Sequence, residues 1–425
     1  MATIKQKVFE FYAKKKEVCD RYYDEAEDSK ISGLYFIEKE NSNIDSFLIK
    51  TAVVILTANK YEKNLLHKNA YKKNSKKIAR FNIELPTACN NHNKIYGYFF
   101  ELNNIPILNL HATVTGSYTI GGSADMVRWV LSNKLLFPVA ILSFGICFGL
   151  MEKRHQIGDV IISKKIYPYF IGSKINEKKL YVVDDNMFDI NSSFLRDIQT
   201  MVTDNKFNNL NFKVDFGNYS TGEAVVSSNY LRQEIKRTTT QDVFAGDMEA
   251  YGLFKECNSY KYPLPCLTIK SICDWGIDKN YNADDEQTLE AFKNELNKKI
   301  ATSLDSDDYT KLLKSLKDRL QAYAAQCAFA CIDILFSEKD FFDKSLFTKM
   351  KKKLKAYNGV AISDHALKQM LCNILKKSNT ECNDYNDYIY KCVTQFEIEG
   401  LLKPDNANST NIQTRSYVGI INREE

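Results

Sequence analysis

Short apolar runs rich in Val, Ile and Leu recur along the chain, separated by polar or glycine-containing segments. Runs of this kind are typical of strands that are buried on both faces of a sheet. The predicted strands are TAVVILTAN (51–59), PVAILSFG (138–145), IGDVIISKKIY (157–167) and LPCLTIKSICDW (264–275), and TGEAVVSS (221–228) predicts a strand or strand end.

Between these runs the apolar residues recur at helical spacing, and residues 1–49 are interpreted as a helix and a connecting loop. The segment 94–114 predicts a hairpin with Asn103-Asn104 at its turn. The predicted helices include SADMVRWVLSNKLL (123–136), NYLRQEIKR (229–237) and DMEAYGLFKECNSY (247–260). This alternation predicts an α/β fold with a central mixed, largely parallel sheet.

The late part of the chain changes character. Residues from about 279 to 318 are charged and helix-prone, and we interpret them as a helical insert forming an arm on the surface. A helix of small and apolar residues follows at 320–336. Three predicted helices and the short strand SYVGII (416–421) then suggest a small winged-helix-like module, a type that binds DNA or proteins. Its lysine run, 349–355, would either contact phosphates or form a solvated helix face.

These elements suggest three regions: a helical N-terminal extension (1–49), a main α/β domain (50–338) and a C-terminal accessory domain (339–425). The net charge of +5 is small for 425 residues and does not favour a general nucleic-acid binder. The eleven cysteines lack metal-site spacing, and we expect reduced core thiols of a cytoplasmic protein. Leu135–Met151 resembles a membrane span, but its Pro and Gly residues favour a buried strand and no membrane.

Three acids lie in stretches that otherwise look like core. Asp247 and Glu249 flank a methionine in DVFAGDMEAYGLF, and Asp274 ends the strand CLTIKSICD. A buried carboxylate costs free energy unless it is paired or used. These positions are therefore candidates for chemistry.

Three segments together carry a family resemblance: ILTANKYEKNLL after the first strand, ILSFGICFGL with QIGDVIIS in the middle, and TGEAVVSS, FAGDMEAYGLFKEC and CLTIKSICDWG later. In this order the chain resembles the nucleoside phosphorylase / methylthioadenosine nucleosidase family over roughly 50–280. The helix at 320–336 is similar to the closing helix of versions found in bacterial antiphage defence proteins. The resemblance implies a three-layer fold and purine N-glycosidic bond cleavage without metal or cofactor.

The resemblance assigns roles to three acids. Asp274 matches the residue that protonates N7 of the leaving purine, and burial would raise its pKa and keep it protonated. Glu249 matches the acid that binds the ribose hydroxyls and stabilises the ribosyl cation. Glu62 matches the acid that activates water, which favours hydrolysis over phosphorolysis. The alternatives are a loop or cap acid for Asp274 and an exposed helix residue for Glu62. Asp247 is expected to be a helix N-cap.

The resemblance also implies substrate contacts. Met248 matches the residue under the sugar, with core packing as its alternative. The turn Ser143–Gly149 would lie against the nucleoside through Gly145, although Cys147 and Phe148 depart from the family's small residues.

The residue expected to stack on the base differs from the family's usual one. Val225 replaces the usual aromatic residue, so Phe144 is the substitute. Gly116 and Ser117 lie in VTGS (114–117), which resembles the family's turn that approaches the sugar or phosphate. Arg232, Lys236 and Arg237 would contact a 5′-phosphate or form a solvated helix face.

The preferred interpretation is a hydrolase that removes the base from a purine nucleoside or nucleotide, ATP-type, as an antiphage defence effector. A homo-oligomer and an activating protein or signal acting through the C-terminal domain are expected. One alternative is a phosphate-dependent phosphorylase or a methylthioadenosine nucleosidase. Another is a catalytically silent nucleotide-sensing or DNA-binding regulator.

Overall fold

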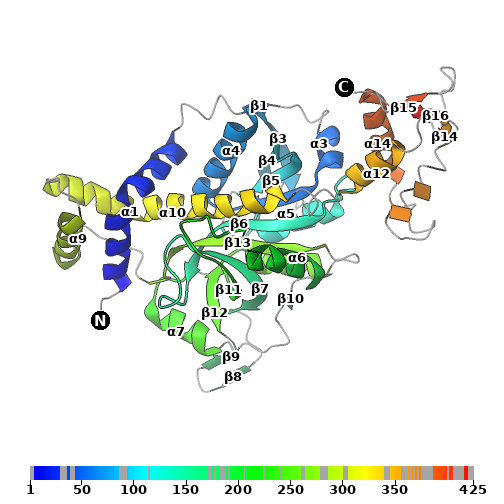
Figure 1. Ribbon diagram of the computed structural model, residues 1–425. Coiled ribbons are helices and arrows are strands. Elements are labelled where there is room, and N and C mark those ends of the chain that lie inside the picture. Colours follow the sequence, from blue (N-terminus) through cyan, green and yellow to red (C-terminus); the bar gives the residue numbers. More distant parts are fainter. Residues whose placement is uncertain are drawn as a thin grey trace.

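The computed structural model contains a central sheet flanked by helices, with a small module near the C-terminus (Figure 1). It describes residues 4–28, 36–38, 44–85, 93–112, 115–169, 174–176, 179–181, 188–189, 192–204, 206–223, 225–238, 242–259, 264–277, 286–299, 305–338, 345–355, 361–363, 366, 369–370, 373–374, 386–399, 402–404 and 416–419.

The main sheet has the strand order β1-β3-β4-β5-β2-β6-β12-β11-β7-β10, and β13 pairs with both β6 and β7. Its strands are β1 (Phe36–Glu38), β2 (Val53–Thr57), β3 (Ile78–Leu85), β4 (Asn93–Leu102), β5 (Ile105–His111), β6 (Ala140–Gly149), β7 (Val160–Pro168), β10 (Phe188–Asp189), β11 (Val214–Thr221), β12 (Val243–Asp247) and β13 (Cys266–Asp274). A separate pair is formed by β8 (Lys174–Asn176) and β9 (Lys179–Tyr181). Parallel and antiparallel pairs both occur, which confirms the prediction of a mixed sheet.

Helices cover the sheet in two groups, and every residue of β2 is buried, as expected for a strand covered on both faces. One group packs through contacts of α10 with α1 and α4, and the other through contacts between α5 and α8. The helices of the main domain are α1 (Ile4–Glu27), α3 (Asp45–Lys50), α4 (Lys60–Asn74), α5 (Ser123–Ser132), α6 (Ser192–Thr203), α7 (Asn229–Thr238), α8 (Ala250–Ser259), α9 (Glu286–Lys299) and α10 (Ser306–Ser337).

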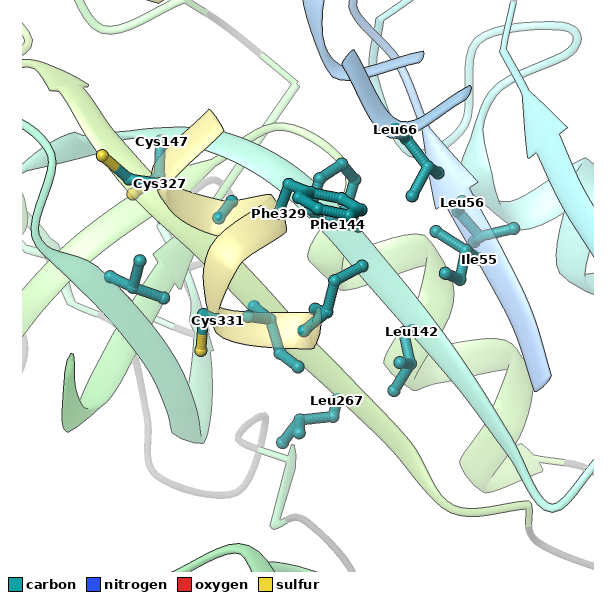
Figure 2. Close-up of a cluster of buried hydrophobic side chains, with 14 of the residues drawn as sticks. Ile55, Leu56, Leu66, Leu142, Phe144, Cys147, Leu267, Cys327, Phe329 and Cys331 are labelled. Atoms are coloured by element: carbon teal, nitrogen blue, oxygen red, sulfur yellow. The ribbon is translucent and has the colours of Figure 1, made fainter. Parts of the chain in front are cut away.

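The main hydrophobic core joins α10 to the centre of the sheet. Figure 2 shows side chains from α10 beside those of β2, β6, β13 and α4: Cys327, Phe329, Cys331, Ile55, Leu56, Leu142, Phe144, Cys147, Leu267 and Leu66. None of the described cysteines forms a disulfide, and all of them are buried, as expected for core thiols. This packing fixes the positions of the strand ends at which the candidate acids lie.

The hairpin prediction is confirmed. Strands β4 and β5 pair antiparallel and are joined at Asn103 and Asn104, whose φ angles are 53° and 64°. Asparagine tolerates this left-handed conformation, which two-residue hairpin turns require. Within the run Leu135–Met151, residues Ala140–Gly149 form the buried strand β6 rather than part of a membrane span.

Other elements differ from the sequence predictions. Strands β1, β3 and β12 were not predicted. Strand β11 ends at Thr221, the first residue of TGEAVVSS, so this segment contains only a strand end. The alternating pattern of IARFNIEL at 78–85 carried the signal for β3, because every second residue faces the core.

Residues 279–318, predicted to form a helical arm on the surface, pack against the main domain in their described part. Helix α10 runs without a break through residue 318, and α9 buries Phe292 and Leu296 in the main core, close to Phe9 of α1. The helix α10 is the one described helix that is long and apolar enough to cross a membrane, but 72% of its apolar window is buried inside the fold. That burial is typical of a core helix.

The C-terminal module combines helices α12 (Leu346–Lys355) and α14 (Asn386–Ile398) with a small antiparallel sheet. The sheet has the order β14-β16-β15, formed by Ala361–Ser363, Ser416–Gly419 and Leu402–Pro404. Tyr388 of α14 donates a hydrogen bond to the Ile49 carbonyl of α3 at 3.2 Å and packs edge-on against Phe137 at 4.5 Å between ring centroids. The module therefore docks where the chain enters β2 and β6.

Candidate active site

A buried lysine organises the candidate site. Lys270 lies in the middle of β13 with 1% of its side chain exposed. Its Nζ atom lies 2.7 Å from Oε2 of Glu249 and 2.9 Å from Oδ2 of Asp247. Burial alone would lower the pKa of Lys270, but Asp247, Glu249 and Glu62 raise it well above its ordinary value. The lysine is therefore charged and holds the acids of the site.

Asp247 and Glu249 are positioned by the turn from β12 to α8. Oδ1 of Asp247 accepts hydrogen bonds from the backbone N–H of Ala250 at 3.1 Å and from the Thr221 hydroxyl at 3.1 Å. Helix α8 begins at Ala250, so Glu249 and not Asp247 lies directly before it, but the Asp247 carboxylate binds the N–H groups at the helix start as the expected N-cap acid would. Its other oxygen pairs with Lys270, so the same carboxylate fixes both the helix and the lysine.

Glu62 is held by backbone groups from two elements. It is the third residue of α4 and closes a capping box with Asn59. Its Oε2 atom accepts from the N–H groups of Ala58 at 2.7 Å and Asn59 at 2.9 Å, and its Oε1 atom accepts from the N–H of Ile146 at 2.9 Å. A carboxylate has about four acceptor positions, so one position remains for a water molecule. Glu62 is 1% exposed, which rules out the alternative of an ordinary surface residue.

Gly145 makes this arrangement possible. Its φ angle is +142°, and a Cβ atom at this position would lie 1.9 Å from Oε1 of Glu62. Only glycine leaves room for the carboxylate to reach the N–H of Ile146. The structure thus places the predicted contact residue Gly145 against the catalytic candidate Glu62.

The environment tunes the proton affinity of Glu62. Burial raises its pKa to about 7, and the negative charge of Glu249 acts in the same direction, whereas Lys270 and the backbone N–H groups oppose the rise. A general base works best when its pKa lies near the operating pH. Glu62 is therefore suited to take a proton from water at neutral pH.

Asp274 lies at the last position of β13, four residues beyond Lys270. The register between β13 and β6 shifts between Ile272 and Asp274, and a bulge of this kind re-aims the side chain that follows it. Asp274 is half-buried, and its Oδ1 atom accepts a hydrogen bond from the N–H of Gly276 at 2.7 Å. Its role as proton donor stays a prediction.

The predicted sugar-contacting turn is linked directly to the site. The hydroxyl of Ser117 donates to the Met248 carbonyl at 2.8 Å, and half-buried Met248 precedes Glu249. The N–H of Ser117 is bound by the carboxylate of Glu223 at 3.1 Å. Gly116 has a φ angle of +118°, and a Cβ atom there would lie 2.8 Å from Glu223. Sequence reasoning overlooked Glu223, which secures this turn.

Two predicted contacts need correction or remain open. Phe144 was expected to stack on a base, but it is fully buried and packs in the cluster that includes Leu66 and Phe329 (Figure 2). It is therefore unavailable to a substrate. Val225 is 53% exposed, and its contact with a base stays a prediction.

The three basic residues of α7 that were predicted to contact a phosphate instead form ion pairs with acids of this chain. Arg232 is 1% exposed and bonds to the Leu150 carbonyl at 2.9 Å and to Glu152. Lys236 lies 3.5 Å from the same Glu152 carboxylate, and Arg237 pairs with Glu234. These cations stabilise the fold around β6 and α7.

Lys270 itself was overlooked in the sequence. Its signal is a single lysine inside the apolar strand CLTIKSICD, four residues before Asp274. A lysine in a strand that is buried on both faces requires acidic partners, and the nearby buried acids supply them.

Replacement of Lys270 by Gln tests its role in holding the acids. The variant leaves buried carboxylates without a cation, so the free energy of unfolding should fall by about 3–5 kcal/mol, measured by urea denaturation at pH 8. Burial already raises the folded-state pKa values of Asp247 and Glu62, and without the cation they rise further. The loss should therefore shrink as the pH falls to about 5. Lys255→Gln, at an exposed position of α8, is the control and should change stability little.

Replacement of Gly145 by Ala tests the close approach to Glu62. The new Cβ atom would displace the carboxylate from Ile146, and kcat/KM for base release should fall at least about 100-fold. The double variant Gly145→Ala/Glu62→Gln should be no slower than the slower single variant, because both changes disable one unit. Additive losses would contradict this coupling.

Comparison with known proteins gives likeness in structure only. No protein-family model matches the chain, and the search of curated proteins finds no match. An S-adenosylhomocysteine nucleosidase from Streptococcus pyogenes shows 13% identity and a TM-score of 0.44, covering 68% of this chain and 98% of that one. A putative 5′-methylthioadenosine/S-adenosylhomocysteine nucleosidase from Borrelia burgdorferi, bound to adenine, shows 18% identity and a TM-score of 0.44. This match covers 67% of this chain and 98% of that one. Futalosine hydrolase of Helicobacter pylori shows 15% identity and a TM-score of 0.41, and the match covers 63% of this chain and 97% of that one. This chain is similar to these hydrolases in structure, and its function is inferred from its own residues.

Proposed function

We propose that this protein hydrolyses the N-glycosidic bond of a purine nucleoside or nucleotide. The observation that carries the proposal is the placement of Glu62. Its carboxylate is buried and fixed by three backbone N–H groups, has a pKa of about 7, and lies in the electrostatic field of Glu249 and Lys270. A water molecule bound at its remaining acceptor position would be activated next to the acids that bind the sugar.

The proposed mechanism assigns one step to each acid. Glu249 accepts hydrogen bonds from the ribose hydroxyls, and its charge stabilises the oxocarbenium-like sugar. Asp274 donates a proton to N7 as the C1′–N9 bond breaks. The water oxygen attacks C1′, and Glu62 takes the proton that this water releases. The products are the free base and the sugar.

The charge balance of the site supports this mechanism. Asp247, Glu249 and Glu62 surround Lys270, the one cation that the described residues place among them, so the cluster carries an excess of negative charge when Glu62 is deprotonated. Negative charge near C1′ lowers the energy of a sugar that becomes cationic. Asp274 stands apart at the end of the same strand, where it would face the base.

The biological role is proposed as that of a cytoplasmic antiphage effector that depletes a purine nucleotide of the ATP type. It is motivated by the resemblance of the closing helix and by the appended C-terminal module. The β14-β16-β15 sheet with α12 and α14 supports a winged-helix-like module. Through it an activating protein or signal would act on a homo-oligomer.

Two alternatives predict different products. A phosphorylase would require phosphate and release a sugar 1-phosphate, and a methylthioadenosine nucleosidase would leave ATP intact. A silent regulator would release no base. Chromatography of ATP, adenosine and methylthioadenosine after incubation with the protein, with and without phosphate, separates these cases. Free adenine formed without phosphate is the expected result.

The pH dependence of kcat/KM tests Glu62 as the base. The deprotonated form is the active one, so the rate should rise with pH and level off above an apparent pKa of about 7. Glu62→Gln should lower the rate about 10²- to 10⁴-fold and abolish this rise. An unchanged pH profile in the variant would show that another group activates water.

Asp274→Asn tests the proton donor. It should slow the release of adenine about 10²- to 10⁴-fold. A substrate with a good leaving group, such as nitrophenyl riboside, needs no N7 proton and should be cleaved by the variant nearly as fast as by the wild type. Equal losses on both substrates would assign Asp274 a structural role.

A further inference from the structure

A cluster of basic side chains lies beside Glu62, on the side of β3, β4 and β5 that faces α4. The cross-strand pairs are His111 with Tyr96, and Tyr98 with Arg80. Tyr98 packs against His67 of α4 at 4.4 Å between ring centroids. Cross-strand partners and alternate residues share one face of a sheet, so His111, Tyr96 and Arg80 face α4 as well. We call Lys63, Arg80 and His111 the basic cluster.

Among the described residues, Lys63 is the member of the cluster whose charge no carboxylate balances. It directly follows Glu62 on the first turn of α4 and is half-buried. The described part of the chain offers its Nζ atom no hydrogen bond or carboxylate, only the ring of Tyr98 at 6.0 Å. Burial, and next the positive charge of Arg80, lower the pKa of Lys63. An anion bound here would stabilise the charged form of Lys63 against both its burial and the repulsion from Arg80.

His111 is held on the same face by Thr57, the last residue of β2. Asn109 accepts a hydrogen bond from His67 at 2.8 Å and donates one to the Thr57 hydroxyl at 3.1 Å. The same hydroxyl lies 3.1 Å from Nδ1 of His111. An imidazole protonated on Nε2, or on both nitrogens, would donate a hydrogen bond to a phosphate oxygen.

Arg80 and Tyr96 lie at the solvent-exposed side of the basic cluster. The guanidinium of Arg80 lies 5.0 Å from the ring centre of Tyr96 and donates to Glu38 at 2.6 Å. Tyr96 is 44% exposed, so the cluster is open to solvent. Arg232 of α7 is also paired with an acid, Glu152, but only 1% of its side chain is exposed, against 34% for Arg80.

We propose that Lys63, His111 and Arg80 bind the phosphate groups of a nucleoside 5′-phosphate whose sugar lies at Glu62 and Glu249. This inference rests on the proposed function and narrows its substrate to the phosphorylated form. The chain itself couples the two places. Thr57, which holds His111, precedes Ala58, whose N–H holds Glu62, and Lys63 follows Glu62. The sugar and phosphate sites thus share one loop and one helix turn.

The test compares AMP and ATP with adenosine in wild type and Lys63→Gln. In the wild type, kcat/KM should be at least about 10-fold higher for the nucleotides. In Lys63→Gln the nucleotide-to-nucleoside ratio should fall about 10- to 100-fold, the effect of losing a charged hydrogen bond. Lys63→Arg keeps the cation and should retain most of the preference.

Lys72→Gln is the matched control, because Lys72 lies on α4 but pairs with Glu25 and is 52% exposed. It should leave the nucleotide-to-nucleoside ratio unchanged. A ratio that is the same in wild type and Lys63→Gln, or a wild type that prefers adenosine, would overturn the inference even when adenine is released.

Calorimetric titration with inorganic tripolyphosphate gives a readout that needs no turnover. Wild type should bind it, and Lys63→Gln should bind at least about 10-fold more weakly. Absence of binding to the wild type would refute the phosphate site. Binding that depends on Lys63, without release of base from any purine compound, would support the phosphate site and refute the proposed hydrolase.

Discussion

The candidate site depends on one buried ion cluster. Lys270 is almost fully buried in a central strand, and such a cation is tolerated only because Asp247 and Glu249 lie within 3 Å of its ammonium group. The dependence is mutual, since the acids would be equally costly without the lysine. Strand β13, the end of β12 and the start of α8 must therefore come together for any one of these residues to be buried.

A second constraint comes from the backbone. Glu62 is held by N–H groups of its own helix start and of Ile146 in β6, and the missing side chain of Gly145 gives the carboxylate its space. These contacts hold the acid in one orientation before any substrate arrives, which is how preorganised sites reduce the cost of reaction. The C-terminal module docks near the opposite ends of β2 and β6 through Ile49 and Phe137. The module therefore contacts the residues that lead into β2 and β6, the two strands next to Glu62.

Sequence patterns predicted the elements with strong local signals. The Asn-Asn hairpin, the buried strands β2, β6, β7 and β13, and the binding of the α8 N–H groups by Asp247 follow from turn chemistry, apolar runs and helix-start rules. Strand β12 was missed because its short run Val243–Asp247 merges with the helix that follows it. Phe144 was misplaced because a one-dimensional pattern does not tell which face of β6 meets α10. Lys270 and Glu223 were missed because their partners are distant in sequence, and long-range pairing leaves no local periodicity.

Charge separation links the two parts of the proposed substrate. Around Lys270 the acids outnumber the cation, so this region favours a sugar that gains positive charge as the base departs. One residue beyond Glu62 the local charge becomes positive. Lys63 has no carboxylate partner in the described part of the chain and lies in the positive field of Arg80. A nucleoside 5′-phosphate has the matching distribution, with a fixed negative charge at one end and a transient positive charge at C1′. A neutral nucleoside would satisfy only the first region and would leave the burial of Lys63 unexplained.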